Sequence, residues 1–151
     1  MTRHKVEGRI HFMIVEQGDV RRPYLVGIVD SQSSRQRQLS ESVLKGGYRT
    51  ITGSDQGDVI AMMERVPNVM IIRDGLPGID TCNVVSKLRE SSFVLVMVIG
   101  SDRETDHILQ IYNAGADLYL NQRELTPRIL VSRIQAQLRG QVWRGQIQAP
   151  G

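Results

Sequence analysis

The sequence predicts an α/β fold in which a doubly wound, five-stranded parallel sheet carries helices on both faces. Two observations support this prediction. Short runs of branched apolar residues recur from Tyr24 onward, as is typical of strands that are buried on both faces. Between these runs lie longer segments whose apolar residues recur every three or four positions, as on one face of a helix. Short strands joined by helical crossovers require a parallel sheet that is covered on both sides.

The five expected strands are short, and they end at polar or glycine-containing turns. They are predicted at residues 25–29, 48–52, 69–72, 93–99 and 118–120. Because ligands of such folds bind at the carboxyl ends of the strands, the residues that follow them are expected to form the working edge of the sheet. These residues are Asp30 and Ser31, Arg73 and Asp74, Gly100 and Ser101, and Asn121 and Gln122.

The five expected helices are marked by capping residues and by residues that stop helices. They are predicted at 34–45, from Asp55 or Asp58 to 66, around 79–88, at 104–114 and from 126 to about 139. Glycines at 46 and 47 end the first helix, and Pro67 breaks the second. Thr126 and Pro127 cap and open the last helix.

The length of 151 residues fits one domain, which we place at residues 24–139. Residues 1–23 form a separate N-terminal extension, in which residues 9–15 are expected to form a short strand. An ordered arm, an interface element and a leader all fit this extension. Residues 140–151, with two glycines and a final Pro-Gly, read as a C-terminal tail or linker.

The composition excludes several classes of protein. With 40% hydrophobic and 23% charged residues, the chain is expected to be globular and not disordered. One cysteine, Cys82, excludes an internal disulfide and indicates a reducing, cytoplasmic compartment. No apolar run is long enough to span a membrane. The net charge of +3 permits acidic partners without requiring nucleic acid.

Three stretches together point to a known family. Residues 67–78 read as a buried strand that runs into a tight turn, with Arg73 at the end of the strand. Residues 114–120 read as a turn into a short strand, and residues 126–139 as a last helix. At this spacing the chain resembles the response-regulator receiver domains of two-component signalling over roughly residues 24–139. The resemblance implies a flavodoxin-like fold of the receiver type.

The resemblance also implies a set of functional positions, most of which are altered here. Receivers hold Mg²⁺ with two adjacent acids after the first strand, where this chain has Asp30 and Ser31. The phosphate-accepting aspartate corresponds to Arg73. The hydroxyl residue that ends the fourth strand corresponds to Gly100, and the lysine after the fifth strand corresponds to Gln122.

These changes imply a degenerate receiver, or pseudo-receiver, that signals without aspartyl phosphorylation. An arginine cannot accept a phosphoryl group, and Asp30 as the residual ligand makes a poor Mg²⁺ site, so weak or absent Mg²⁺ binding is expected. Arg73 is expected to neutralise Asp30, because both lie at the same sheet edge. Tyr119 holds the position of the family's switch aromatic residue. Gly100 leaves space behind the ring, so permanent burial of the ring is one interpretation. An ordinary half-buried aromatic side chain is the expectation we favour, because no phosphate biases the ring between two positions.

Two alternatives remain open at this point. Asp74 becomes the phosphate acceptor if a one-residue bulge turns it towards Asp30. Without a bulge, it reads as a loop or capping carboxylate. The domain also fits the input half of a longer DNA-binding or enzymatic regulator. The chain itself is not expected to be an enzyme, because it has neither a glycine-rich phosphate loop after its first strand nor a nucleophile elbow.

The resemblance also indicates where partners bind. In receivers the face formed by the fourth helix, fifth strand and fifth helix commonly pairs domains or meets other proteins. The expected partner is therefore a protein or a second copy of the chain, with arginines of the last helix reaching acids such as Glu104 and Asp106. Nucleic-acid binding by this domain alone is not expected, because no recognition motif accompanies the basic residues, which are Arg128, Arg133, Arg139 and Arg144.

Overall fold

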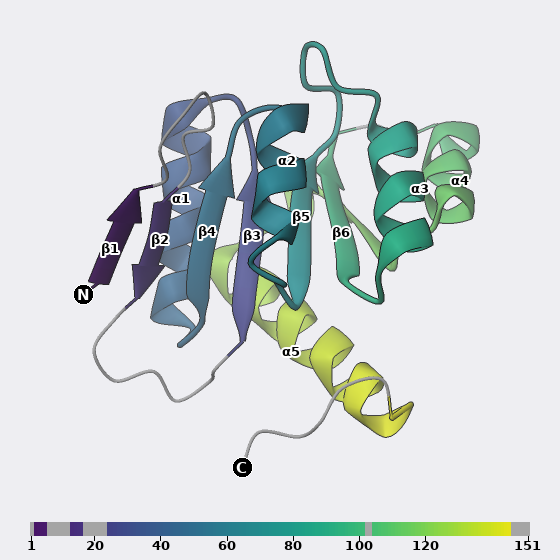
Figure 1. The fold of residues 1–151 in the computed structure, drawn as a ribbon. Coiled ribbons are helices and arrows are strands. Elements are labelled where there is room, and N and C mark those ends of the chain that lie inside the picture. The colour runs from purple at the N-terminus through teal and green to yellow at the C-terminus, as the bar shows by residue number, and fades with distance from the viewer. Residues whose placement is uncertain (1, 6–12, 17–23, 102–103, 146–151) are drawn as a thin grey trace.

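The computed structural model describes residues 2–5, 13–16, 24–101 and 104–145 (Figure 1). The described strands are β1 (Thr2–Lys5), β2 (Met13–Glu16), β3 (Leu25–Val29), β4 (Arg49–Gly53), β5 (Val69–Arg73), β6 (Leu95–Gly100) and β7 (Leu118–Asn121). The described helices are α1 (Ser33–Lys45), α2 (Gln56–Met63), α3 (Thr81–Ser91), α4 (Thr105–Ala114) and α5 (Pro127–Trp143), with a 3-10 turn at Gln122–Glu124. The strands form one sheet in the order β1-β2-β4-β3-β5-β6-β7.

The predicted fold class is confirmed. The strands β4, β3, β5, β6 and β7 are parallel to their neighbours in this order. Helices α1 and α5 cover one face of the sheet, and α2, α3 and α4 cover the other (Figure 1). β3 is apolar throughout because its side chains enter the cores on both faces of the sheet. Val26 and Ile28 enter the core under α1 and α5, whereas Leu25 and Val29 enter the opposite core.

The sheet is larger than the five strands that the sequence predicts. β2 pairs antiparallel with β4, with Ile14 opposite Ile51 and Val15 opposite Thr50, and β1 pairs antiparallel with β2. The described parts of the N-terminal extension are therefore an ordered addition to the sheet. They cover the β4 edge, which would otherwise present unpaired backbone groups. Of the strand expected at 9–15, residues 9–12 lie outside the described residues.

The last helix extends beyond residues 139 and 140, where the sequence predicts the boundary between domain and tail. α5 continues to Trp143, and Gln141 is 2% exposed. The Gln141 side chain donates from Nε2 to the carbonyl oxygen of Phe93 at 2.7 Å. This contact with a distant turn helps the helix to continue past Gly140, a residue with poor helix propensity. Residues 146–151 of the expected tail lie outside the described residues.

The starts of α2 and α5 follow the local sequence signals. Asp55, and not Asp58, is the N-cap of α2: its side chain accepts from the backbone N–H of Asp58 at 2.8 Å. Asp58 accepts in return from the backbone N–H of Asp55, which completes a capping box. Thr126 caps α5 as predicted, with Pro127 in its first turn. In the described part of the chain, no helix has the length and apolar character needed to cross a membrane.

Candidate functional site

The carboxyl ends of the parallel strands bring the predicted positions together. Asp30 directly follows β3, Arg73 ends β5, Gly100 ends β6, and Gln122 directly follows β7. Ser31 lies beside Asp30 and is exposed. These strand ends lie at one level of the sheet, because Arg73 pairs with Ile99 of β6 and Gly100 pairs with Asn121 of β7.

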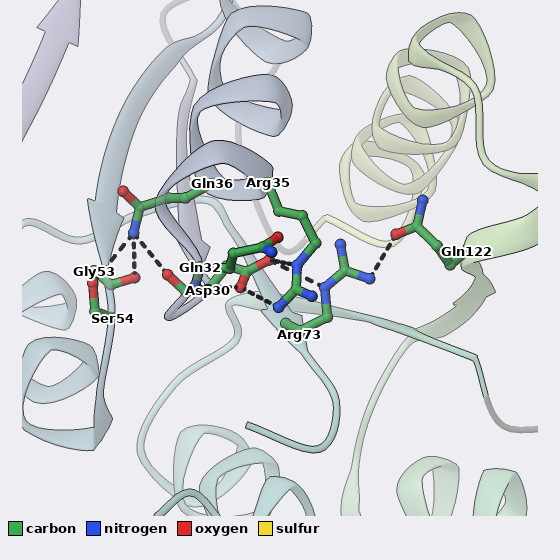
Figure 2. Close-up of polar contacts among 8 residues, drawn as sticks. All are labelled: Asp30, Gln32, Arg35, Gln36, Gly53, Ser54, Arg73 and Gln122. Carbon is green, nitrogen blue, oxygen red and sulfur yellow. Dashed lines mark hydrogen bonds and ion pairs between the residues drawn. The ribbon is translucent and has the colours of Figure 1, made fainter. Parts of the chain in front are cut away.

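Asp30 is fully buried, and its carboxylate accepts hydrogen bonds from three residues (Figure 2). Arg35 binds both oxygens as a fork, with Nε at 2.9 Å from Oδ2 and Nη2 at 2.8 Å from Oδ1. The Nε of Arg73 lies 3.2 Å from Oδ2, and the backbone N–H of Gln32 donates to Oδ1 at 3.0 Å. The predicted pair between Arg73 and Asp30 is therefore present, and it is shared with a second arginine.

The role of Arg35 was not predicted, although the sequence carries a signal for it. Arg35 lies in the first turn of α1, where a cation is disfavoured by the helix dipole and where α1 has no acidic residue. An arginine at such a position indicates a nearby anion. Gln36 holds the same turn in place, because its Nε2 donates to the carbonyl oxygens of Asp30 and Gly53, each at 2.9 Å (Figure 2).

Arg73 bridges the ends of β5 and β7. Arg73 is 8% exposed, and its Nη1 donates to Oε1 of Gln122 at 2.6 Å (Figure 2). The amide oxygen of Gln122 suits this role, whereas the lysine that receivers carry at this position would repel the guanidinium. Relative to receiver domains, position 73 has a cation in place of an anion, and position 122 has a hydrogen-bond acceptor in place of a cation. The two changes therefore fit one another.

The charges of the cluster support one another. Burial opposes the ionisation of Asp30, but the hydrogen bonds from Arg35 and Gln32 and the charges of both arginines outweigh it, so the pKa of Asp30 lies below its usual value. Burial lowers the pKa of Arg73, and the neighbouring Asp30 offsets part of this effect. With two guanidinium groups around one carboxylate, the trio of Asp30, Arg35 and Arg73 carries a net charge of +1.

The side chains at this edge do not fit the Mg²⁺ ion that the receiver fold implies. Both carboxylate oxygens of Asp30 already accept from arginine side chains, and the Arg73 guanidinium lies against Oδ2. Ser31 supplies no carboxylate, and Mg²⁺ in proteins is held mainly by carboxylates and water. Within residues 24–101 and 104–145, no three His, Cys, Asp or Glu side chains are grouped so as to hold a metal ion.

Asp74 turns towards α4 and forms a contact that was not predicted from the sequence. Its Oδ2 lies 2.6 Å from Nε2 of His107, and its backbone N–H donates to the carbonyl oxygen of Ile99 at 2.8 Å. β5 keeps its register with β6 through Arg73, without the bulge that the alternative acceptor required. The Asp74 carboxylate is therefore a partner of a helix side chain, and neither a capping group nor a neighbour of Asp30.

Tyr119 occupies the space that Gly100 leaves open. A Cβ atom added to Gly100 would lie 2.9 Å from Cζ of the Tyr119 ring and 3.1 Å from Cβ of Asp74. The ring is half-buried and packs against the core on the α2, α3 and α4 side. The ring is therefore half-buried, as we expect for an ordinary aromatic side chain at this position, and it is not fully buried.

Sequence comparisons relate the chain to the receiver part of response regulators. No family model matches the chain. It is 30% identical over 99 residues to the transcriptional regulatory protein KdpE of Mycobacterium tuberculosis, a match that covers 65% of this chain and 44% of KdpE. It is 29% identical over 114 residues to the DNA-binding response regulator MtrA of Mycolicibacterium smegmatis, covering 74% of this chain and 49% of MtrA. The chain thus spans about half the length of the curated relatives it matches.

Solved structures show the same fold. The CheY-like receiver domain protein of Methanospirillum hungatei superposes with a TM-score of 0.75 at 19% identity, covering 82% of this chain and 99% of that chain. An orphan response regulator of H. pylori superposes with a TM-score of 0.69 at 20% identity, covering 76% and 96%. The curated relatives are response regulators and the similar solved structures are receiver domains, so the chain has the receiver-domain fold and is similar in sequence to response regulators.

Proposed function

We propose that this domain acts in two-component signalling as a pseudo-receiver, which binds a protein partner or a second copy of itself without being phosphorylated on aspartate. The bridge from Asp30 through Arg73 to Gln122 carries the proposal. It fills the places of the phosphate acceptor, the metal ion and the phosphate-binding lysine with one hydrogen-bonded network. The domain is a binding module under this proposal, and not an enzyme.

The physical argument concerns what phosphoryl transfer needs. The reaction depends on a positioned nucleophile and on cations that neutralise the charge of the phosphoryl group. Arg73 offers no nucleophile, and its guanidinium is engaged by Asp30 and Gln122. Gly100 has no hydroxyl group to follow a phosphoryl oxygen. Asp74 has a carboxylate, but this group is held by His107 on α4.

The binding surface that we propose is the α4–β7–α5 face, which is formed by the edge strand β7 and the helices on either side of it. Leu109 and Tyr112 of α4 are 50% and 37% exposed, and Ile129 of α5 is 38% exposed. Large apolar side chains that stay exposed on the elements beside a sheet edge favour contact with another protein. The hydroxyl of Tyr112 accepts from the backbone N–H of Tyr119 at 2.9 Å and so ties α4 to β7.

A second candidate function is that of the input domain of a longer regulator. KdpE and MtrA are described as a transcriptional regulator and a DNA-binding response regulator, and the chain matches about half of each. In such a protein the α4–β7–α5 face would contact an output domain or pair two regulators. Both candidates use the same face, and they differ in which partner occupies it.

The test of phosphorylation independence is an amide NMR titration with Mg²⁺ and beryllium fluoride, a mimic of the aspartyl phosphate. We expect no saturable shifts of Asp30, Arg73 or Gln122, because the guanidinium of Arg73 occupies the site. The same titration on Asp74→Asn is the control for the alternative acceptor. Saturable shifts in the natural sequence that disappear in Asp74→Asn would reject the proposal and assign phosphorylation to Asp74.

The binding surface is tested by self-association. We expect sedimentation velocity to show a reversible dimer. Leu109→Arg is expected to raise the dissociation constant of this dimer by at least about tenfold, because the new charge would be desolvated at the contact. Ile60→Arg on α2 is the matched control, because Ile60 is 67% exposed on another helix. Equal weakening by both variants would move the contact away from the α4–β7–α5 face. A chain that stays monomeric would reject the homodimer.

A further inference from the structure

A cavity of about 140 Å³ opens beside the arginine cluster, between the start of α1 and the turn from β7 into α5. One wall of the cavity is polar and is formed by Arg35, Arg73 and Gln122. The lining also includes the apolar side chains of Leu39 and Leu130. The cavity thus combines cationic groups from one strand end and one helix with an apolar lining, and small-ligand sites commonly combine a few polar groups with apolar side chains in this way.

The arginines retain donors that the cluster does not use. Asp30 takes Nε and Nη2 of Arg35 and Nε of Arg73, and Gln122 takes Nη1 of Arg73. Within the described residues, these bonds leave Nη1 of Arg35 and Nη2 of Arg73 for another acceptor. The trio of Asp30, Arg35 and Arg73 also carries a net charge of +1, so one further negative charge would neutralise it.

We propose that this cavity binds a small organic monoanion, with its carboxylate between Arg35 and Arg73 and a short apolar body against Leu39 and Leu130. Carboxylates suit guanidinium groups, because both are planar and bind through paired hydrogen bonds. A single negative charge neutralises the net charge of +1 on the cluster. A phosphate dianion carries more negative charge than the cluster can neutralise and would be repelled more strongly by Asp30. The proposal does not rest on the proposed binding of proteins.

The size of the cavity sets the size of the ligand. Its volume of about 140 Å³ equals that of roughly five molecules of liquid water, which suits a carboxylate of a few carbon atoms. A more open groove of about 690 Å³ between α1 and α5 shares Gln38, Ser42 and Pro127 with the cavity. A longer ligand would therefore extend from the arginines along this groove.

The experiment is an amide and arginine side-chain NMR titration at constant ionic strength, with chloride as the reference anion. The probes are acetate, butyrate, benzoate and inorganic phosphate. We expect butyrate or benzoate to shift Arg35, Arg73 and Leu125 saturably, and acetate to bind more weakly because it lacks an apolar body. No saturable shifts, or shifts that map to other parts of the domain, would overturn the proposal. Tighter binding of phosphate than of every carboxylate would overturn the ligand class.

Two variants and a matched control separate this site from general charge attraction. Arg35→Gln is expected to weaken the binding of butyrate or benzoate by at least about tenfold. Arg37→Gln removes the same charge from an exposed position of α1 outside the cavity, and it is expected to leave binding unchanged. Gln122→Glu is expected to abolish binding while keeping the fold, because its added carboxylate would pair with Arg73 and neutralise the cluster. Equal weakening by Arg35→Gln and Arg37→Gln, or unchanged binding to Gln122→Glu, would overturn the proposal.

Discussion

Replacing Asp30 by asparagine is expected to lower the free energy of unfolding by about 3 kcal/mol and the Tm by about 6–12 °C. Asp30 is fully buried and is shared by Arg35 and Arg73. Without its charge, the two guanidinium groups repel one another. Arg73, at 8% exposure, cannot replace its partner with bulk water. Asparagine has nearly the same shape as aspartate, so the loss would report the charge and not a cavity. Chemical denaturation near neutral pH measures the change.

Two further variants show whether the effect belongs to the ion pairs. Asp106→Asn removes an exposed acid from α4 and is expected to change the free energy of unfolding by no more than about 0.5 kcal/mol. The double variant Asp30→Asn/Arg73→Met is expected to be more stable than Asp30→Asn alone, because it removes the stranded cation together with its partner. A double variant that is less stable than Asp30→Asn would contradict this account of the cluster.

The effect of Asp30→Asn is also expected to depend on pH. The pKa of Asp30 is lowered in the folded protein, so its contribution to stability is complete above the unfolded pKa, which is about 3.9. The contribution is lost as the pH falls through the folded pKa. The difference in stability between the natural sequence and Asp30→Asn should therefore be constant from about pH 7 to about pH 5, and it should shrink below about pH 4. A difference that already shrinks near pH 6 would contradict the lowered pKa.

Gly100→Ala is expected to drive the Tyr119 ring out of its inward position and to lower the free energy of unfolding by about 1–2 kcal/mol. The new Cβ would lie 2.9 Å from Cζ of Tyr119, which is closer than carbon atoms approach without moving. The Tyr119 side chain can rotate outwards, whereas Gly100 is held by its pairing with Asn121. The exposure of the ring is measured by the effect of a soluble paramagnetic agent on its NMR signals, and the stability by denaturation.

The control for this prediction is a background without the ring. In Tyr119→Ala the close contact with the ring is gone and the approach to Cβ of Asp74 at 3.1 Å remains, so Gly100→Ala should then cost less than in the natural sequence. Gly57→Ala on the exposed side of α2 is the matched glycine variant, and it should stabilise by roughly 0.5–1 kcal/mol. An equal cost of Gly100→Ala with and without the Tyr119 ring would show that the ring does not fill this space.

Much of the candidate site was predictable because it depends on strand ends. In a parallel sheet all strands finish at one edge, so Asp30 and Arg73 were expected to meet although 43 residues separate them. The sharing of Asp30 with Arg35 was not predicted, because it depends on where α1 begins relative to β3. The pair of Asp74 and His107 was not predicted either, because it depends on how closely α4 packs beside the end of β5.

The sequence by itself determined the type and order of the elements from Tyr24 onward, because apolar periodicity and capping residues act over a few neighbouring positions. The tertiary structure alone decided that β1 and β2 extend the sheet and that α5 continues to Trp143. It also decided which donors surround Asp30. These outcomes depend on contacts between residues far apart in the chain, such as that of Gln141 with Phe93. Hydrogen bonds form only where folding brings their atoms to about 3 Å, a condition that no local pattern encodes.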